Sequence, residues 1–256
     1  MPVTPGQFVW RDLMTTDPAG AAAFYAAVFG WTVIETDLGP LGTHRLFQEA
    51  DEVGIGGIIP IPAGKGYPSS WVSYIATPNL DRVIRRAKGG GGVVHVGAAE
   101  IPGLGRYALI EDPQGAGFGA IHLAADAPDR RDPAAHGWDE LCTTDLPAAV
   151  AFYRELFAYE TEEMPLGDAG TYTLLRAGGD GPEARKAGAM AKPEWLPTSA
   201  WVVYFSTADI DAARARIEPQ GGALLGPVTP VPGQGRVCAA RDTTGALFYL
   251  IEWEQD

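Results

Sequence analysis

The sequence is poor in cysteine and histidine and has no long apolar run. It holds two cysteines, Cys142 and Cys238, and four histidines among 256 residues. Two cysteines inside apparent strands form neither a disulfide framework nor a zinc knuckle. No apolar run approaches the roughly 18 residues that a membrane-spanning helix needs. The first residues lack the basic and apolar regions of a signal peptide. We therefore expect a cytoplasmic protein with no membrane partner.

Basic charge is also scarce. Nineteen Lys and Arg residues stand against 32 Asp and Glu residues, which gives a net charge of -13. Phosphate backbones and anionic lipids repel such a chain, so nucleic-acid binding and membrane-surface binding are not expected. The length and the 46% hydrophobic content are sufficient for one large domain or two mid-sized domains. We expect a small molecule as the partner, and the sequence leaves open whether the protein is a monomer or a homodimer.

The chain contains a long internal repeat. "WRDLMTTD" at residues 10–17 returns as "WDELCTTD" at residues 138–145, and later landmarks recur with an offset of 130 instead of 128. Such a fixed order of landmarks, with one small insertion, indicates a duplication. A stretch rich in Pro, Asp and Arg separates the copies and is typical of a linker. We predict a first domain at 1–123, a linker at 124–135 and a second domain at 136–256.

Each half shows the pattern strand, helix, strands, and then the same pattern again. Asp17 followed by Pro18 is typical of a helix start, and Gly30 is typical of a helix end. A second helix follows Asn79 and stops at a run of glycines. The turn that begins at Asp112 predicts a closing hairpin. The expected fold class is α+β, with two βα-plus-strands modules in each half.

Three segments carry a resemblance to a known family. "AAAFYAAVFGW" with its capping Asp17, "WVSYIATPNLDRVIRRAKGGGG" from residue 71 and "IEDPQGAGFGAIHL" from residue 110 are similar to the vicinal oxygen chelate superfamily, the glyoxalase, bleomycin-resistance and extradiol-dioxygenase fold. More narrowly, the paired motifs resemble two-domain actinobacterial members typified by a mycobacterial glyoxalase-like culture-filtrate antigen. The resemblance implies tandem glyoxalase-like domains. Each would be built from two βαβββ modules that form a curved mixed sheet around a cavity.

In metal-dependent members of this family, each cavity holds a divalent ion on His, Gln or Glu side chains. The resemblance carries the ligand positions onto residues of other types, which are Trp10, Trp71, Gly119 and, within a residue or two, Gly57 in the first half, and Trp138, Trp201, Tyr249 and Ala189 in the second. None of these is a strong ligand for a divalent ion. The four histidines share no position between the halves. We therefore expect no metal and no cofactor.

Tryptophans occupy four of the implied metal positions. Because side chains alternate along a strand, Trp10 shares a face with Asp12 and Met14, and Trp138 shares a face with Glu140. Indoles beside a carboxylate suit a flat, partly aromatic ligand. The alternative is that the tryptophans fill the core. The candidate ligand-binding residues are Trp10, Trp71, Trp138, Trp201, Met14, Tyr249, His44 and Tyr172.

Asp12 and Glu140 are the candidate catalytic residues. A carboxylate with an apolar surrounding gains a raised pKa, which suits a general acid or base. The alternative is a structural ion pair with Arg106 and Arg236, which are also equivalent in the repeat. His44 and Tyr172, which each follow Gly-Thr, are candidate hydrogen-bond donors at the rim of the cavity, and the alternative for both is a surface position beside a turn.

Three functions are compatible with these residues. The first is metal-independent binding of a small hydrophobic or aromatic metabolite or antibiotic, in resistance, sequestration or an accessory role in natural-product biosynthesis. The second is a lyase, isomerase or oxygenase-type enzyme that uses Asp12 or Glu140, with or without a metal. The third is a glyoxalase-type metalloenzyme whose ligands lie elsewhere. The sequence leaves open whether the protein is an enzyme.

Overall fold

The structure is a computed structural model of the chain. It describes residues 3–37, 42–62, 64, 66–125, 127, 135–166, 170–179 and 184–254. Most of the linker predicted at 124–135 lies outside the described residues.

The first half contains two successive βαβββ modules. Their elements are β1 (Phe8–Thr15), α1 (Pro18–Phe29), β2 (Thr32–Asp37), β3 (Thr43–Gln48) and β4 (Gly54–Pro60), then β5 (Ser70–Ala76), α2 (Leu80–Gly89), β6 (Val93–Ile101), β7 (Gly105–Glu111) and β8 (Gly117–Leu123).

The second half repeats this order with a divided strand after its last helix. Its elements are β9 (His136–Thr143), α3 (Leu146–Phe157), β10 (Glu160–Pro165), β11 (Thr171–Arg176), β12 (Arg185–Ala191), β13 (Ala200–Ser206), α4 (Ile210–Ile217), the 3₁₀ helix η4 (Glu218–Gln220), β14 (Ala223–Leu224), β15 (Thr229–Val231), β16 (Gly235–Arg241) and β17 (Leu247–Trp253). The α+β class with two modules in each half is confirmed.

The ends of α1 follow from local chemistry. The Asp17 side chain accepts a hydrogen bond from the backbone N–H of Gly20 at 2.9 Å, and so it caps a donor that the first helical turn leaves unpaired. Pro18 needs no such partner because it has no N–H. Gly30 ends the helix in the left-handed conformation with φ 77°, which glycine adopts without a steric penalty.

Each half contributes one mixed sheet. The eight-stranded sheet runs β2-β3-β4-β1-β5-β8-β7-β6, and the nine-stranded sheet runs β10-β11-β12-β9-β13-β17-β16-β14, with β15 paired to β16. In both sheets the first and last strands of the first module are parallel, since β1 pairs with β4 and β9 pairs with β12. Strands that follow each other in a hairpin pair antiparallel, as β2 with β3, β3 with β4, and β7 with β8 do.

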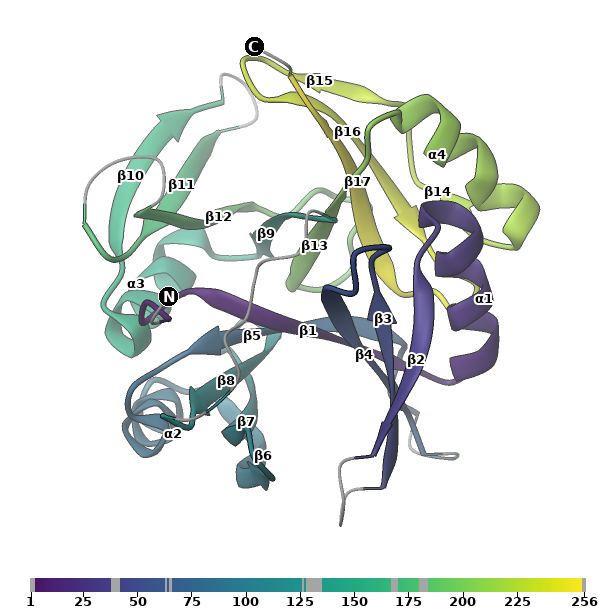
Figure 1. Cartoon of the computed structure of the whole chain (residues 1–256). Helices are drawn as coiled ribbons and strands as arrows, with labels where there is room; N and C mark the ends of the chain where they lie inside the picture. Colours follow the sequence, from purple (N-terminus) through teal and green to yellow (C-terminus); the bar gives the residue numbers. More distant parts are fainter. Residues whose placement is uncertain are drawn as a thin grey trace. The chain divides into compact units, whose positions relative to one another are not determined.

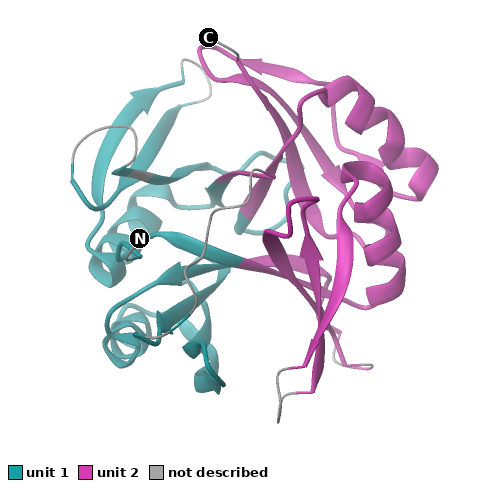
Figure 2. Cartoon of the chain, viewed as in Figure 1, with its two compact units in different colours: residues 1–10, 73–130, 139–201 teal, residues 11–72, 131–138, 202–256 magenta. Residues whose placement is uncertain are grey.

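The chain divides into two compact units that do not coincide with the two halves (Figure 2). Unit 1 comprises residues 1–10, 73–130 and 139–201, and unit 2 comprises residues 11–72, 131–138 and 202–256. Each unit therefore combines one module of the first half with one module of the second. In unit 1 the helices α2 and α3 lie side by side, and in unit 2 α1 and α4 do (Figure 1).

The helices present one apolar face to the sheets. In α2, Leu80, Val83 and Ala87 are buried, and Arg82, Arg85 and Lys88 are exposed.

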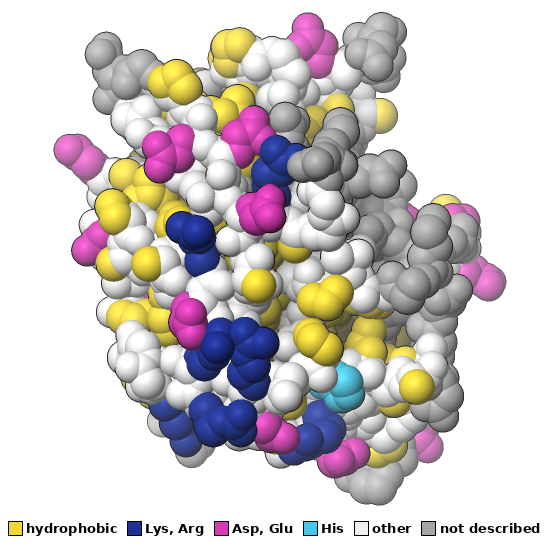
Figure 3. Space-filling model, turned by 90° about the vertical axis from the view of Figure 1, so that its left-hand side faces the viewer, with side chains coloured by type: hydrophobic (Ala, Val, Ile, Leu, Met, Phe, Trp, Pro, Cys, Tyr) yellow, Lys and Arg dark blue, Asp and Glu magenta, His cyan; other side chains and the backbone are white. Residues whose placement is uncertain are grey.

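Figure 3 shows Lys and Arg side chains gathered on part of one face of the molecule. Among the described residues, none of the helices combines the length and the apolar character that crossing a membrane requires.

Candidate functional site

Each strand divides its side chains between two environments. In β1, Arg11, Leu13 and Thr15 are buried, whereas Asp12 and Met14 are partly exposed. Leu13 belongs to the hydrophobic cluster that holds the buried side of α1. We call the face of a sheet that packs on helices the helix-packed face and the opposite one the helix-free face. Trp10 alternates in phase with Asp12, as the sequence predicts, and β1 directs both to the helix-free face.

In unit 2, Asp12 lies in a row of residues on this helix-free face. Its register partner in β4 is Gly57, and Gly57 in turn pairs with Leu46 of β3. His44 precedes Leu46 by two residues and so has the same orientation along β3. The partner of Met14 in β4 is Ile59.

In unit 1, Glu140 lies in the equivalent row. Its partner in β12 is Gly188, one residue before the position that the family resemblance indicates, and Gly188 pairs with Leu174. The hydroxyl of Tyr172 lies against Gly188. Cys142 is on the same face, and its thiol donates to Glu140 Oε1 at 3.7 Å. Burial and the neighbouring Glu140 raise the pKa of the Cys142 thiol, so this group is a proton donor and not a nucleophile at neutral pH.

Tyrosines that the sequence analysis missed line the remaining helix-free faces. In unit 1 the ring of Tyr74 lies over its β8 partner Gly119 and contacts Tyr107, with ring centroids 6.1 Å apart. In unit 2 the rings of Tyr204 and the predicted Tyr249 stack at 4.5 Å and 23°. The signal was present, because "WVSY" and "WVVY" place a tyrosine three residues after each second-module tryptophan.

Trp71 and Trp201 lie on the helix-packed face. Their exposed fractions are 4% and 5%. The indole N–H of Trp71 donates to Tyr25 Oη at 2.7 Å in unit 2, and that of Trp201 donates to Tyr153 Oη at 2.8 Å in unit 1. These positions favour the alternative that both indoles fill the core. The partly buried Trp10 and Trp138 belong to the other side of the strands.

Each of these tyrosines continues a buried hydrogen-bond chain. Tyr25 donates to Asp242 Oδ2 at 3.4 Å, and Tyr153 donates to Asp112 Oδ2 at 3.1 Å. The other carboxylate oxygen of Asp112 accepts from the backbone of the hairpin turn. Burial, followed by the adjacent carboxylate, raises the pKa of both tyrosine hydroxyls well above the usual value. The two tyrosine hydroxyls therefore remain protonated, and their hydrogen bonds hold α1 and α3 to the hairpin turns.

The arginines considered as partners of the two acids contact other carboxylates. Arg106 lies 3.4 Å from Asp81 and 3.9 Å from Glu100. Arg236 lies 2.9 Å from Asp211 and 2.8 Å from Glu252. Both guanidinium groups are thus engaged at partly exposed positions of their own units.

Two buried charges next to the candidate acids also escaped the sequence analysis. Arg11 is 1% exposed and donates from Nη2 to His136 Nε2 at 2.6 Å in unit 2. Asp139, its equivalent in the repeat, is fully buried and accepts from the Ser73 hydroxyl at 2.5 Å in unit 1. "WRD" and "WDE" carry a charge between Trp and acid in both copies, which was the available signal. Such groups need partners inside the protein.

The described residues do not fit a divalent metal. Within the ranges given above, no three His, Cys, Asp or Glu side chains gather closely enough to hold an ion. Asp12 and Glu140 both face glycines across the parallel pair. A single carboxylate in each row provides too few ligands for zinc or for a harder ion.

Comparison with known proteins is consistent with the two-repeat fold. The family model for the Glyoxalase/Bleomycin resistance protein/Dioxygenase superfamily matches residues 6–119 and 132–250. The chain is 30% identical to CFP32 of Mycobacterium tuberculosis (strain CDC 1551), over 95% of this chain and 93% of that protein. It is also 30% identical to the anthracycline biosynthesis protein DauV of Streptomyces sp. (strain C5), over 97% of this chain and 94% of DauV.

Solved structures resemble the fold at lower identity. The Mn(II)-bound glyoxalase from Novosphingobium aromaticivorans superposes with a TM-score of 0.66 at 16% identity, covering 98% of this chain and 83% of that one. The 2,3-dioxygenase LapB from Pseudomonas sp. KL28 gives a TM-score of 0.65 at 13% identity, with 99% and 94% coverage. At these identities the likeness extends to the fold alone.

Proposed function

The chain belongs to the Glyoxalase/Bleomycin resistance protein/Dioxygenase superfamily, and we propose that it binds a small, flat, hydrophobic or aromatic molecule on the helix-free faces of its sheets. This binding does not require a divalent metal ion. It serves resistance, sequestration or an accessory role in natural-product biosynthesis.

The observation that carries the proposal is the make-up of the helix-free faces. They present aromatic rings, namely Trp10, Trp138, Tyr74, Tyr204 and Tyr249, together with one carboxylate row in each half. The register partner of each carboxylate is a glycine, and in the Glu140 row the hydroxyl of Tyr172 lies over that glycine. Each stacked ring contributes roughly 1–3 kcal/mol to the binding of a flat partner, so two rings supply a large part of the roughly 8 kcal/mol that micromolar affinity requires.

The relatives support the ligand class. DauV and DnrV, which match over 94% of their length, are named for anthracycline biosynthesis. Anthracyclines are flat and polycyclic, with hydroxyl and keto groups. Such a molecule offers a face to the aromatic side chains and donors to the carboxylates of Asp12 and Glu140.

Isothermal titration calorimetry with quinizarin, a planar hydroxyquinone, tests this proposal. We expect a micromolar Kd for the wild-type protein, unchanged by EDTA. Trp10→Ala and Trp138→Ala should each weaken binding about 5- to 150-fold, the equivalent of roughly 1–3 kcal/mol.

Trp195→Ala is the matched control, because Trp195 is 41% exposed in a loop and lies on neither sheet face. It should bind like the wild type. Loss of binding in EDTA, or an unchanged Kd in both the Trp10 and Trp138 variants, would overturn the proposal.

A second candidate, acid–base catalysis, is favoured by the row around Glu140. The carboxylate of Glu140 and the hydroxyl of Tyr172 flank the same residue, Gly188. In this arrangement the carboxylate can take a proton from carbon next to a carbonyl, and the phenol can donate a hydrogen bond to the enolate oxygen that forms.

Deuterium exchange at the CH₂ group of 2-hydroxyacetophenone, followed by NMR in heavy water, tests this activity. The wild type should accelerate the exchange, and Glu140→Gln should abolish the acceleration. Glu160→Gln, an exposed substitution in β10, is the control. Wild-type exchange at the rate of buffer alone excludes this candidate.

A further inference from the structure

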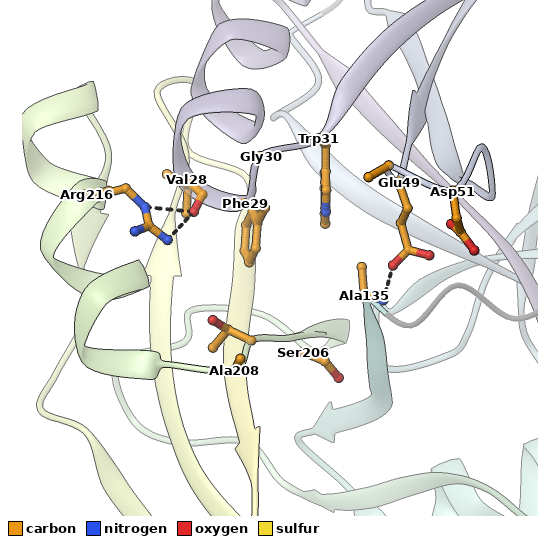
Figure 4. Close-up of a pocket in the computed structure, with 12 residues that line it drawn as sticks. Val28, Phe29, Gly30, Trp31, Glu49, Asp51, Ala135, Ser206, Ala208 and Arg216 are labelled. Atoms are coloured by element: carbon orange, nitrogen blue, oxygen red, sulfur yellow. Dashed lines mark hydrogen bonds between the residues drawn. The ribbon is translucent and has the colours of Figure 1, made fainter.

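Unit 2 contains a pocket at the C-terminal end of α1 (Figure 4). It has a volume of about 540 Å³. It is lined by the end of α1, by the turn between β3 and β4, by Ala135 and by the loop that leads into α4. This volume is typical of small-molecule sites, which run to roughly 300–1,000 Å³. Phe29 and Trp31 form its aromatic wall, with rings stacked at 4.6 Å and 14°.

Trp31 brings a hydrogen-bond donor to this pocket. The residue is 5% exposed, and its ring is fixed by Phe29 and by Tyr25, whose centroid lies 5.6 Å away. Figure 4 shows the ring extending into the pocket with its nitrogen at the inner end. Among the described residues, the indole N–H of Trp31 has no acceptor. The nitrogen is not among the fully buried polar atoms that lack a partner, so the N–H opens into the pocket, where an acceptor from outside the chain can reach it.

The equivalent corner of unit 1 is closed by the protein itself. Trp31 corresponds to Tyr159 in the repeat, and the hydroxyl of Tyr159 donates to the carbonyl of Gly6 at 2.5 Å. Tyr159 is 2% exposed, so the same position there is both buried and satisfied. The unsatisfied donor is therefore a difference between the two units and not a property of the module.

A second donor differs in the same way. Arg216 of α4 uses Nε and Nη2 to bond the carbonyl of Val28 at 3.0 and 2.8 Å. Its equivalent in unit 1, Arg86, bonds the Glu155 carbonyl and also the Glu155 carboxylate, 3.0 Å away. The position of Glu155 is taken by Ala27 in the first half. In the described part of the chain, no carboxylate pairs with Arg216, and its Nη1 group is left for a ligand.

We propose that this corner of unit 2 is a second ligand site, which binds a flat, neutral aromatic ketone whose carbonyl oxygen accepts from Trp31 Nε1–H. The aromatic body contacts Phe29 and Val28, and Arg216 lines the pocket beyond them, on the side away from Trp31 (Figure 4). The carboxylates of Glu49 and Asp51 line the side next to Trp31 (Figure 4). Together with the net charge of -13, they disfavour an anionic ligand.

The test uses the seven tryptophan indole signals in ¹H–¹⁵N NMR of the whole chain, with the Trp31 signal assigned through Trp31→Phe. Titration with 9-fluorenone should move the Trp31 signal downfield in a saturable manner. Fluorene, the same ring system without the carbonyl, should not. The signals of Trp71 and Trp201 should stay in place, because their N–H groups are already bonded to tyrosines.

Ala208→Phe is the blocking variant. Ala208 is exposed and lines the pocket, so the larger ring fills the site without disturbing the core. It should weaken 9-fluorenone binding about tenfold or more, while its other indole signals match those of the wild type. The proposal is overturned if the Trp31 signal does not move, if fluorene moves it equally, if 9-fluorenecarboxylate binds more tightly than the ketone, or if Ala208→Phe binds normally.

Discussion

At the scale of single residues, the buried Trp–Tyr–Asp chains explain why each half repeats a tyrosine in its first helix and an aspartate in its closing turn. Tyr153 accepts from Trp201 and donates to Asp112, so one hydroxyl satisfies two buried groups. Tyr25 does the same between Trp71 and Asp242. Removing that hydroxyl leaves an indole N–H and a carboxylate oxygen without partners.

Tyr153→Phe should therefore lower the free energy of unfolding by about 1–3 kcal/mol, because two buried polar groups lose their hydrogen-bond partner. The change keeps the ring and its volume, so packing is preserved. Urea denaturation followed by circular dichroism measures the effect. Tyr67→Phe, at a side chain 58% exposed, is the control and should change nothing. Equal stabilities for all three proteins would show that the chain contributes little.

The cysteines give a residue-scale prediction about pH. Burial raises the pKa of the Cys142 and Cys238 thiols, and both are free cysteines in buried positions. The thiolate is the reactive form, so the native protein should react only slowly with Ellman's reagent at pH 8 and faster as the pH rises. In guanidinium chloride both thiols should react at once. Fast reaction of either thiol in the native state at pH 8 would contradict this prediction.

At the scale of elements, the ends of α1 and α3 offer a comparison inside one molecule. Gly30 ends α1 with φ 77°, and Ala158 ends α3 with φ 58°. The left-handed conformation costs a residue with a Cβ about 1–2 kcal/mol, whereas glycine avoids this cost but loses more entropy on folding. No atom lies within 4 Å of a Cβ built on Gly30, so only the backbone term applies there.

Ala158→Gly should thus raise the melting temperature, with a gain of a few tenths to about 1 kcal/mol in unfolding free energy. Gly30→Ala should lower it by a similar amount. Differential scanning calorimetry of both variants measures the pair. Shifts of the same sign for both substitutions would be incompatible with a backbone origin.

Caps, strand alternation and module order were predictable from the sequence because they depend on neighbouring residues. Asp17 and Gly30 lie where the chain needs a cap, and Trp10 alternates with Asp12 as expected. The period of a strand shows which side chains share a face, but not which face the helix covers. For that reason the sequence could not place Trp71 and Trp201, which are directed toward the tyrosines of α1 and α3.

At the scale of the whole molecule, the pairing of modules could not be predicted either. The two halves carry the same motifs, so each first module could pack with either second module by pattern alone. The structure combines modules from different halves in each unit. The hydrogen bonds follow this arrangement, since Tyr25 of the first half bonds Asp242 of the second, and Tyr153 of the second bonds Asp112 of the first.

This arrangement makes the separate halves interdependent. A fragment of residues 1–123 contains Tyr25 and Asp112, and a fragment of residues 136–256 contains Tyr153 and Asp242, so neither holds a bonded pair from the intact chain. We expect neither fragment to be a folded monomer. Mixing the two should restore a cooperative thermal transition, measured by circular dichroism, in a one-to-one complex seen by analytical ultracentrifugation.

A single fragment can give the hydroxyl of its helix tyrosine a carboxylate partner by forming a homodimer. Asp112 and Asp242 are equivalent in the repeat, so two copies of the first half can exchange modules, with Tyr25 of each copy bonding Asp112 of the other. Any folded form of residues 1–123 should therefore be a dimer, and Tyr25→Phe should weaken the dimer together with its melting temperature. A monomeric fragment with a cooperative transition would contradict this prediction, because an isolated half would then bury its own helix without a partner.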